Sequence, residues 1–72
     1  MRNLILDALI VFYEGQIKVA KANIEIFLEN SVGVGEHNDI IETIDKEIAK
    51  IADAEDKLQI VLKHLKVREP RI

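Results

Sequence analysis

Apolar residues recur at alternating steps of three and four along two long stretches of this chain, and this spacing constrains the fold more than any other feature. Residues spaced in this way lie on one face of an α-helix, so each stretch predicts a helix with one heptad-patterned apolar stripe, as in coiled coils. The first stripe consists of Leu6, Ile10, Tyr13, Ile17, Ala20, Ile24 and Phe27. The second stripe consists of Ile41, Ile44, Ile48, Ile51, Glu55, Leu58, Leu62 and Leu65.

One segment with strong turn signals separates the two stretches. It covers residues from about 30 to 38 and contains Gly33 and Gly35 among asparagine and serine residues. We therefore predict helices over about 3–29 and 39–66, followed by a short C-terminal tail around Pro70. The whole chain is expected to be one domain, an all-α antiparallel two-helix hairpin.

Folding the chain back at this turn pairs the two stripes layer by layer and predicts one buried polar pair. Phe27 is expected to lie opposite Ile41 at the turn end. In the same register Glu55, the one acidic residue of either stripe, falls opposite Tyr13. Because a buried carboxylate is costly without a hydrogen-bond donor, we predict that Glu55 accepts a hydrogen bond from the Tyr13 hydroxyl.

A second apolar row on the first helix predicts that the hairpin self-associates. This row lies about 110° around the helix from the first stripe, so one partner helix cannot cover both. A chain of 72 residues without cysteine has a small core and no disulfide to reinforce it. We expect a homodimer that forms a four-helix bundle, whereas the side with Asp7, Glu14, Lys21, Asp45, Gln59 and Lys66 faces water. The predicted oligomer interface consists of Ile5, Leu9, Phe12, Val19, Ile26 and Val61.

The charge and hydropathy of the chain argue against a membrane protein or a nucleic-acid-binding protein. The segment 4–13 is apolar except for Asp7, but it is too short to span a bilayer and no small-residue cleavage site follows it. The formal net charge of −3 does not favour the broad basic surface that phosphate binding needs. The expected location is the cytoplasm.

The candidate metal-binding residues do not form a site in the predicted hairpin. His37 and His64 lie about 40 Å apart along the second helix and cannot share a metal ion within one chain. The acidic residues Glu42, Asp45, Asp53 and Asp56 resemble carboxylate sites of helical bundles in composition, but only Glu55 is expected to point inward. We therefore predict no catalytic residue, metal or cofactor. A small metal-dependent enzyme on a dimeric bundle and a nucleic-acid-associated regulator remain the alternatives.

The segments 27–37, FLENSVGVGEH, and 51–58, IADAEDKL, resemble small uncharacterised helical proteins of tailed marine phages, including phages of cyanobacteria. The resemblance spans most of the chain. It implies a phage-encoded protein that acts in the cytoplasm of a host bacterium and binds a host or phage protein. It implies no catalytic residue.

Overall fold

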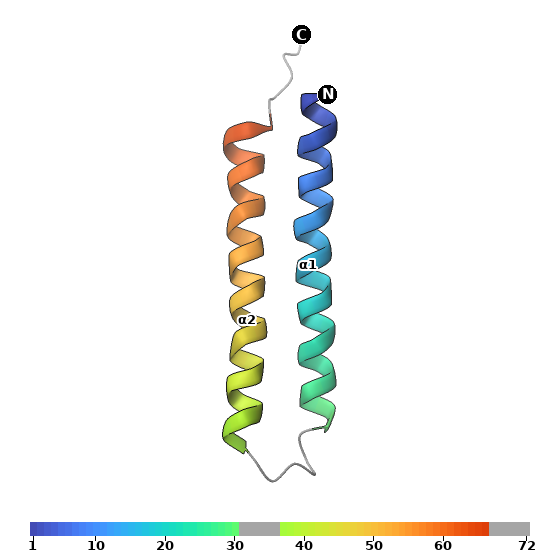
Figure 1. Ribbon diagram of the computed structural model, residues 1–72. Coiled ribbons are helices and arrows are strands. Elements are labelled where there is room, and N and C mark those ends of the chain that lie inside the picture. The colour runs from blue at the N-terminus through green and yellow to red at the C-terminus, as the bar shows by residue number, and fades with distance from the viewer. Residues whose placement is uncertain (31–36, 67–72) are drawn as a thin grey trace.

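The computed structural model describes residues 1–30 and 37–66, which form two long helices lying side by side (Figure 1). Helix α1 is Arg2–Asn30, helix α2 is His37–Ile60, and α2 continues into a π-helical turn, η1, at Val61–Leu65. The described ranges contain no strand, so the all-α prediction is confirmed for them, and the two helices run in opposite directions as a hairpin (Figure 1). Neither helix contains an apolar stretch long enough to cross a bilayer.

The bounds of both helices lie close to the predicted ranges of about 3–29 and 39–66. Most of the predicted turn and of the C-terminal tail, with Gly33, Gly35 and Pro70, lies outside the described residues. The described part of the hairpin consists of its two helices and the contacts between them.

Helix α1 turns toward α2 the residues expected from the sequence. Leu6 and Ala20 are buried in the contact between the helices. The other members of the row are half-buried, and these are Ile10, Tyr13, Ile17, Ile24 and Phe27. Burial therefore follows the predicted stripe along the whole length of α1.

Helix α2 presents a different row from the one predicted. Glu47, Ala54 and Val61 are buried, and these residues follow one another at every seventh position. The predicted row, one residue further along the chain, is exposed instead: Ile41 is 66% and Ile48 is 52% exposed. Leu62, Leu65 and Glu55 are exposed as well. Three residues shared by both arrangements, Ile44, Ile51 and Leu58, are half-buried at the edge of the contact.

This rotation of α2 corrects two expectations from the sequence. Glu55 is exposed, so it does not form the expected buried pair with Tyr13, and Glu47 is the buried carboxylate. Val61 is only 4% exposed within the hairpin, where it packs in the contact between α2 and α1 instead of in an intermolecular interface. The small side chain of Ala54 suits a close contact between two helices, whereas the corresponding residue of the neighbouring row is the charged Glu55.

Polar contacts hold the two helices together at the open end of the hairpin. In η1 the Lys66 N–H donates to the Val61 carbonyl oxygen at 2.7 Å, five residues earlier, which defines the π-helical turn. From α1, the Arg2 guanidinium donates to the Leu65 carbonyl oxygen at 2.6 Å, so a side chain satisfies a carbonyl at the helix end. The Lys66 ammonium group also pairs with the Asp7 carboxylate at 2.5 Å.

The burial of two neighbouring residues on α2 gives a test of its rotation. Ala54→Leu should lower the free energy of unfolding by about 1–3 kcal/mol, because the larger side chain overpacks a closed contact. Glu55→Leu at the exposed neighbouring position should change it by no more than about 0.5 kcal/mol. Urea denaturation followed by circular dichroism measures both values. A large effect at Glu55 with none at Ala54 would show that α2 has the other rotation.

Candidate functional site

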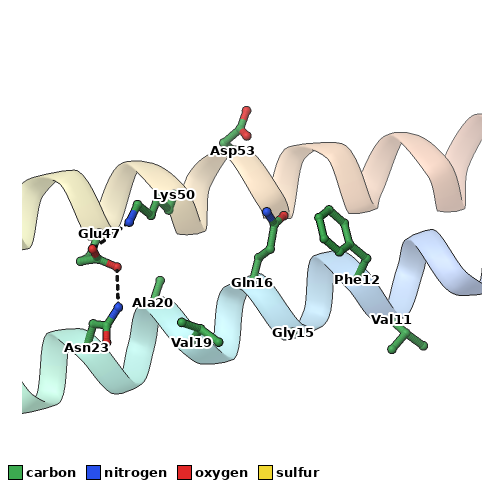
Figure 2. A pocket seen from close by; sticks show the side chains of 10 residues that line it. All are labelled: Val11, Phe12, Gly15, Gln16, Val19, Ala20, Asn23, Glu47, Lys50 and Asp53. Atoms are coloured by element: carbon green, nitrogen blue, oxygen red, sulfur yellow. Dashed lines mark hydrogen bonds and ion pairs between the residues drawn. The ribbon is translucent and has the colours of Figure 1, made fainter.

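A groove of ≈ 600 Å³ lies between the helices in the middle of the hairpin (Figure 2). From α1 it is lined by Phe12, Gly15 and Val19, and from α2 by Glu47 and Lys50, with Asp53 on the rim. Gln16 and Asn23 of α1 also line it, so the α1 side combines apolar and polar side chains, whereas the α2 side is charged.

Phe12 and Val19 of the groove belong to a row of exposed large side chains along α1. Ile5, Phe12, Val19 and Ile26 are 53–62% exposed although the hairpin is fully formed. The Phe12 ring lies against the Tyr13 ring, with centroids 5.7 Å apart and planes tilted by 56°. Four of the six residues predicted for the oligomer interface thus lie on the surface.

The other two residues predicted for the oligomer interface are less exposed. Leu9 is half-buried, and Val61 is buried inside the hairpin. The exposed residues of the predicted interface therefore all belong to α1. We call Ile5, Phe12, Val19 and Ile26 the Phe12 row.

Gly15 lies in the groove beside the Phe12 row. A Cβ atom added at this glycine would meet no heavy atom within 4 Å, so Gly15 is not required for the contact between α1 and α2. A glycine in a helix interior costs roughly 1 kcal/mol relative to alanine. Within one hairpin no packing offsets this cost.

Glu47 is the buried acid of the groove and was not anticipated from the sequence. It is 7% exposed, and its Oε1 accepts a hydrogen bond from the Asn23 side-chain amide at 3.3 Å. Its Oε2 accepts one from the Lys50 ammonium group at 3.0 Å (Figure 2). The hydrogen bond from Lys50, followed by that from Asn23, holds the pKa of Glu47 below its ordinary value, so the carboxylate is ionised at neutral pH.

The sequence does contain a signal for this arrangement. Lys50 follows Glu47 by three residues, a spacing that brings opposite charges together on a helix. Asn23 of α1 supplies the second donor, but its place opposite Glu47 depends on the register of the two helices. The spacing of Glu47 and Lys50 alone therefore did not predict that Glu47 is buried.

The other carboxylates near the groove are exposed. Asp53 pairs with Lys57 at 2.9 Å, and its hydrogen bond raises the pKa of Lys57. Asp45 and Asp56 face outward, as expected from the sequence. Among residues 1–30 and 37–66, no three histidine, cysteine, aspartate or glutamate side chains come together in a way that could hold a metal ion. The groove therefore combines apolar side chains of α1 with the paired charges of Glu47 and Lys50.

Neither a comparison with protein-family models nor searches among curated proteins and solved structures finds a match to this chain. Function is therefore inferred from the geometry of the hairpin.

The lowered pKa of Glu47 predicts a pH dependence of stability. In the unfolded chain Glu47 titrates near 4.5, and in the folded chain it titrates lower, so the ionised carboxylate stabilises the fold above pH 4.5. This contribution should be lost as the pH falls through the pKa of the folded state. Comparing the free energy of unfolding of wild type and Glu47→Gln at several pH values between 7 and 2 isolates the effect from that of the other acids. A constant difference between the two proteins across this range would contradict the role given to Glu47.

Proposed function

We propose that this chain is a non-enzymatic interaction module that works as a homo-oligomer, in the simplest case a dimer of hairpins whose four helices form a bundle. The exposure of the Phe12 row carries this proposal. Within the hairpin the inner stripe of α1 is already in contact with α2. The Phe12 row lies outside this contact and still exposes four large apolar side chains. Soluble monomers rarely leave a continuous apolar patch of this kind uncovered.

The small core of the hairpin supports the same proposal. The hydrophobic residues that are buried in the described part of the chain are Leu6, Ala20, Ala54 and Val61, and two of these are alanines. Burying one large aliphatic or aromatic side chain stabilises a fold by roughly 1.5–3 kcal/mol. Covering the Phe12 row would therefore add more apolar burial than the two alanines supply within one chain.

The arrangement of residues along α1 favours a second copy as the cover. The large residues of the Phe12 row lie seven positions apart, and the exposed small residues Ala8, Gly15 and Ala22 lie between them. Together they form a second heptad seam in which large and small side chains alternate. Two copies of α1 related by a twofold axis can place the large residues of each against the small residues of the other. Gly15 then gains the close contact that it lacks in the single hairpin.

The biological setting follows from the sequence resemblance alone. The likeness of residues 27–37 and 51–58 to tailed-phage proteins supports a phage-encoded protein of the bacterial cytoplasm that binds a host or phage protein. In such a module the bundle gives stability, and its outer surfaces are left for the partner.

Substitution in the Phe12 row tests self-association. Wild type should elute from a size-exclusion column with light scattering at the mass of two or more chains at micromolar concentration. Phe12→Glu should elute as a monomer and lose most of its helical circular dichroism, because it places charges in the middle of the apolar contact. Glu14→Lys, two residues along on the other side of α1, serves as the control and should change neither mass nor helicity.

A well-folded wild-type monomer would refute the homo-oligomer. Retention of the oligomeric mass by folded Phe12→Glu would show that the chains associate through a different surface.

A further inference from the structure

On its α1 side the groove has the shape that receives one side chain of a facing helix. Four of its lining residues, Phe12, Gly15, Gln16 and Val19, lie at positions i, i+3, i+4 and i+7 of one helix (Figure 2). In paired helices, four neighbouring residues of this kind form the hole into which the partner helix inserts a side chain. All four are exposed in the single hairpin, and no heavy atom lies within 4 Å of the position that a Cβ atom of Gly15 would take. The hole is therefore open to a side chain from outside the hairpin.

The order of large and small residues along α1 determines the direction in which two copies can pack. Three of the four residues of the Phe12 row are followed, three positions later, by the exposed small residues Ala8, Gly15 and Ala22. In a parallel pair equal positions face each other, so Phe12 would meet the partner's Phe12 and Gly15 the partner's Gly15. Such layers are crowded at one level and leave a gap at the next. In an antiparallel pair one order is reversed, and each large residue can face a small one.

One antiparallel register matches the sizes of all three layers. It places Phe12 against the partner's Gly15, so the largest side chain of the row meets the residue without a side chain. The other layers of this register are Ile5 with the partner's Ala22 and Val19 with the partner's Ala8. Since Phe12 enters the hole around Gly15 in this register, the groove and the alternation of sizes lead to the same arrangement.

The charged residues near this face of α1 favour the same direction. Glu29 continues the row of small residues, seven positions after the last of them. In a parallel pair Glu29 would meet the partner's Glu29, and two like charges would repel each other. In the antiparallel register these two carboxylates lie at opposite ends of the assembly. Lys18 and Glu25 flank the row on the side away from α2, where the antiparallel register places them beside the partner's Val11 and the partner's Leu4, both apolar.

The charged wall of the groove does not oppose this arrangement. Within one chain Glu47 pairs with Lys50 at 3.0 Å, and Asp53 pairs with Lys57 at 2.9 Å. The residues that the antiparallel α1 brings toward this wall are uncharged, and they are the partner's Leu9 and the partner's Gln16. A second copy therefore adds no like charge to the groove.

We infer that two copies of α1 pack antiparallel and that Phe12 of the partner subunit enters the groove over Gly15. This inference rests on the proposed self-association and adds its direction and register. By twofold symmetry each chain donates one ring and receives one, so the groove of each hairpin is completed by the other. Room for this ring offsets the cost of a glycine inside a helix.

Cysteine cross-linking tests the direction on the full-length chain, which has no cysteine of its own. Ala8→Cys and Ala22→Cys, one of them labelled with a heavy nitrogen isotope, are mixed, allowed to exchange subunits and treated with a short bismaleimide. In the antiparallel register Ala8 lies about 4.5 Å along the axis from the partner's Ala22, but about 16 Å from the partner's Ala8. Mass spectrometry should therefore find the mixed product in at least about tenfold excess over either self-linked product.

The products separate failure of this inference from failure of the proposed function. An excess of self-linked products would show parallel helices and overturn the inference, while self-association would stand. An oligomeric mass without any cross-link would overturn it as well, because these positions of α1 would lie outside the interface. A monomeric wild type in light scattering would overturn the self-association itself and the inference with it.

An exchange of large and small residues tests the register. Gly15→Leu fills the hole from its own chain and should raise the dissociation constant of the dimer at least about tenfold, although leucine clashes with nothing in the hairpin and favours a helix. Adding Phe12→Ala should recover much of this loss, because a small residue then faces the new leucine. Sedimentation equilibrium measures these constants. Glu14→Leu, the same new side chain on the other side of α1, is the control and should leave the constant unchanged. Additive losses from Gly15→Leu and Phe12→Ala would contradict the register.

Discussion

The hairpin contains two helices, and each can turn only one stripe of its surface toward the other. On α2 that stripe is the line of Glu47, Ala54 and Val61, and on α1 it includes the buried Leu6 and Ala20. Small residues at the centre of the contact bring the helices close together, and Asn23 and Lys50 supply the donors that a buried Glu47 requires. Several large apolar side chains, among them Phe12, Val19 and Ile48, remain exposed outside this contact.

The sequence predicted the hairpin, the bounds of its helices and the inner row of α1, because these depend on local periodicity. It did not predict the rotation of α2. On this helix two adjacent rows are both largely apolar and each contains one glutamate, Glu47 or Glu55, so periodicity alone cannot separate them. The difference lies in the other helix, where Asn23 can reach Glu47, and a tertiary contact of this kind is not encoded in the spacing of either row.

For the candidate site, too, the sequence predicted what depends on one helix and missed what depends on the packing of two. Ile5, Phe12, Val19 and Ile26 could be assigned to the surface because they lie far around α1 from the inner stripe. Val61 was misplaced because its position depends on the rotation of α2. The groove beside Gly15 requires the register of two helices, so no pattern within one helix could reveal it.

The central claim is that folding of this chain is coupled to its association, and the dependence of unfolding on protein concentration tests it most directly. If only the oligomer is well folded, mass action makes the stability depend on the concentration of chains. Thermal unfolding followed by circular dichroism over a hundredfold range of concentration should show a Tm that rises steadily with concentration and a helical signal that falls on dilution. A single Tm, independent of concentration, with full helicity at the lowest concentration would show that the hairpin is stable alone and would contradict the account.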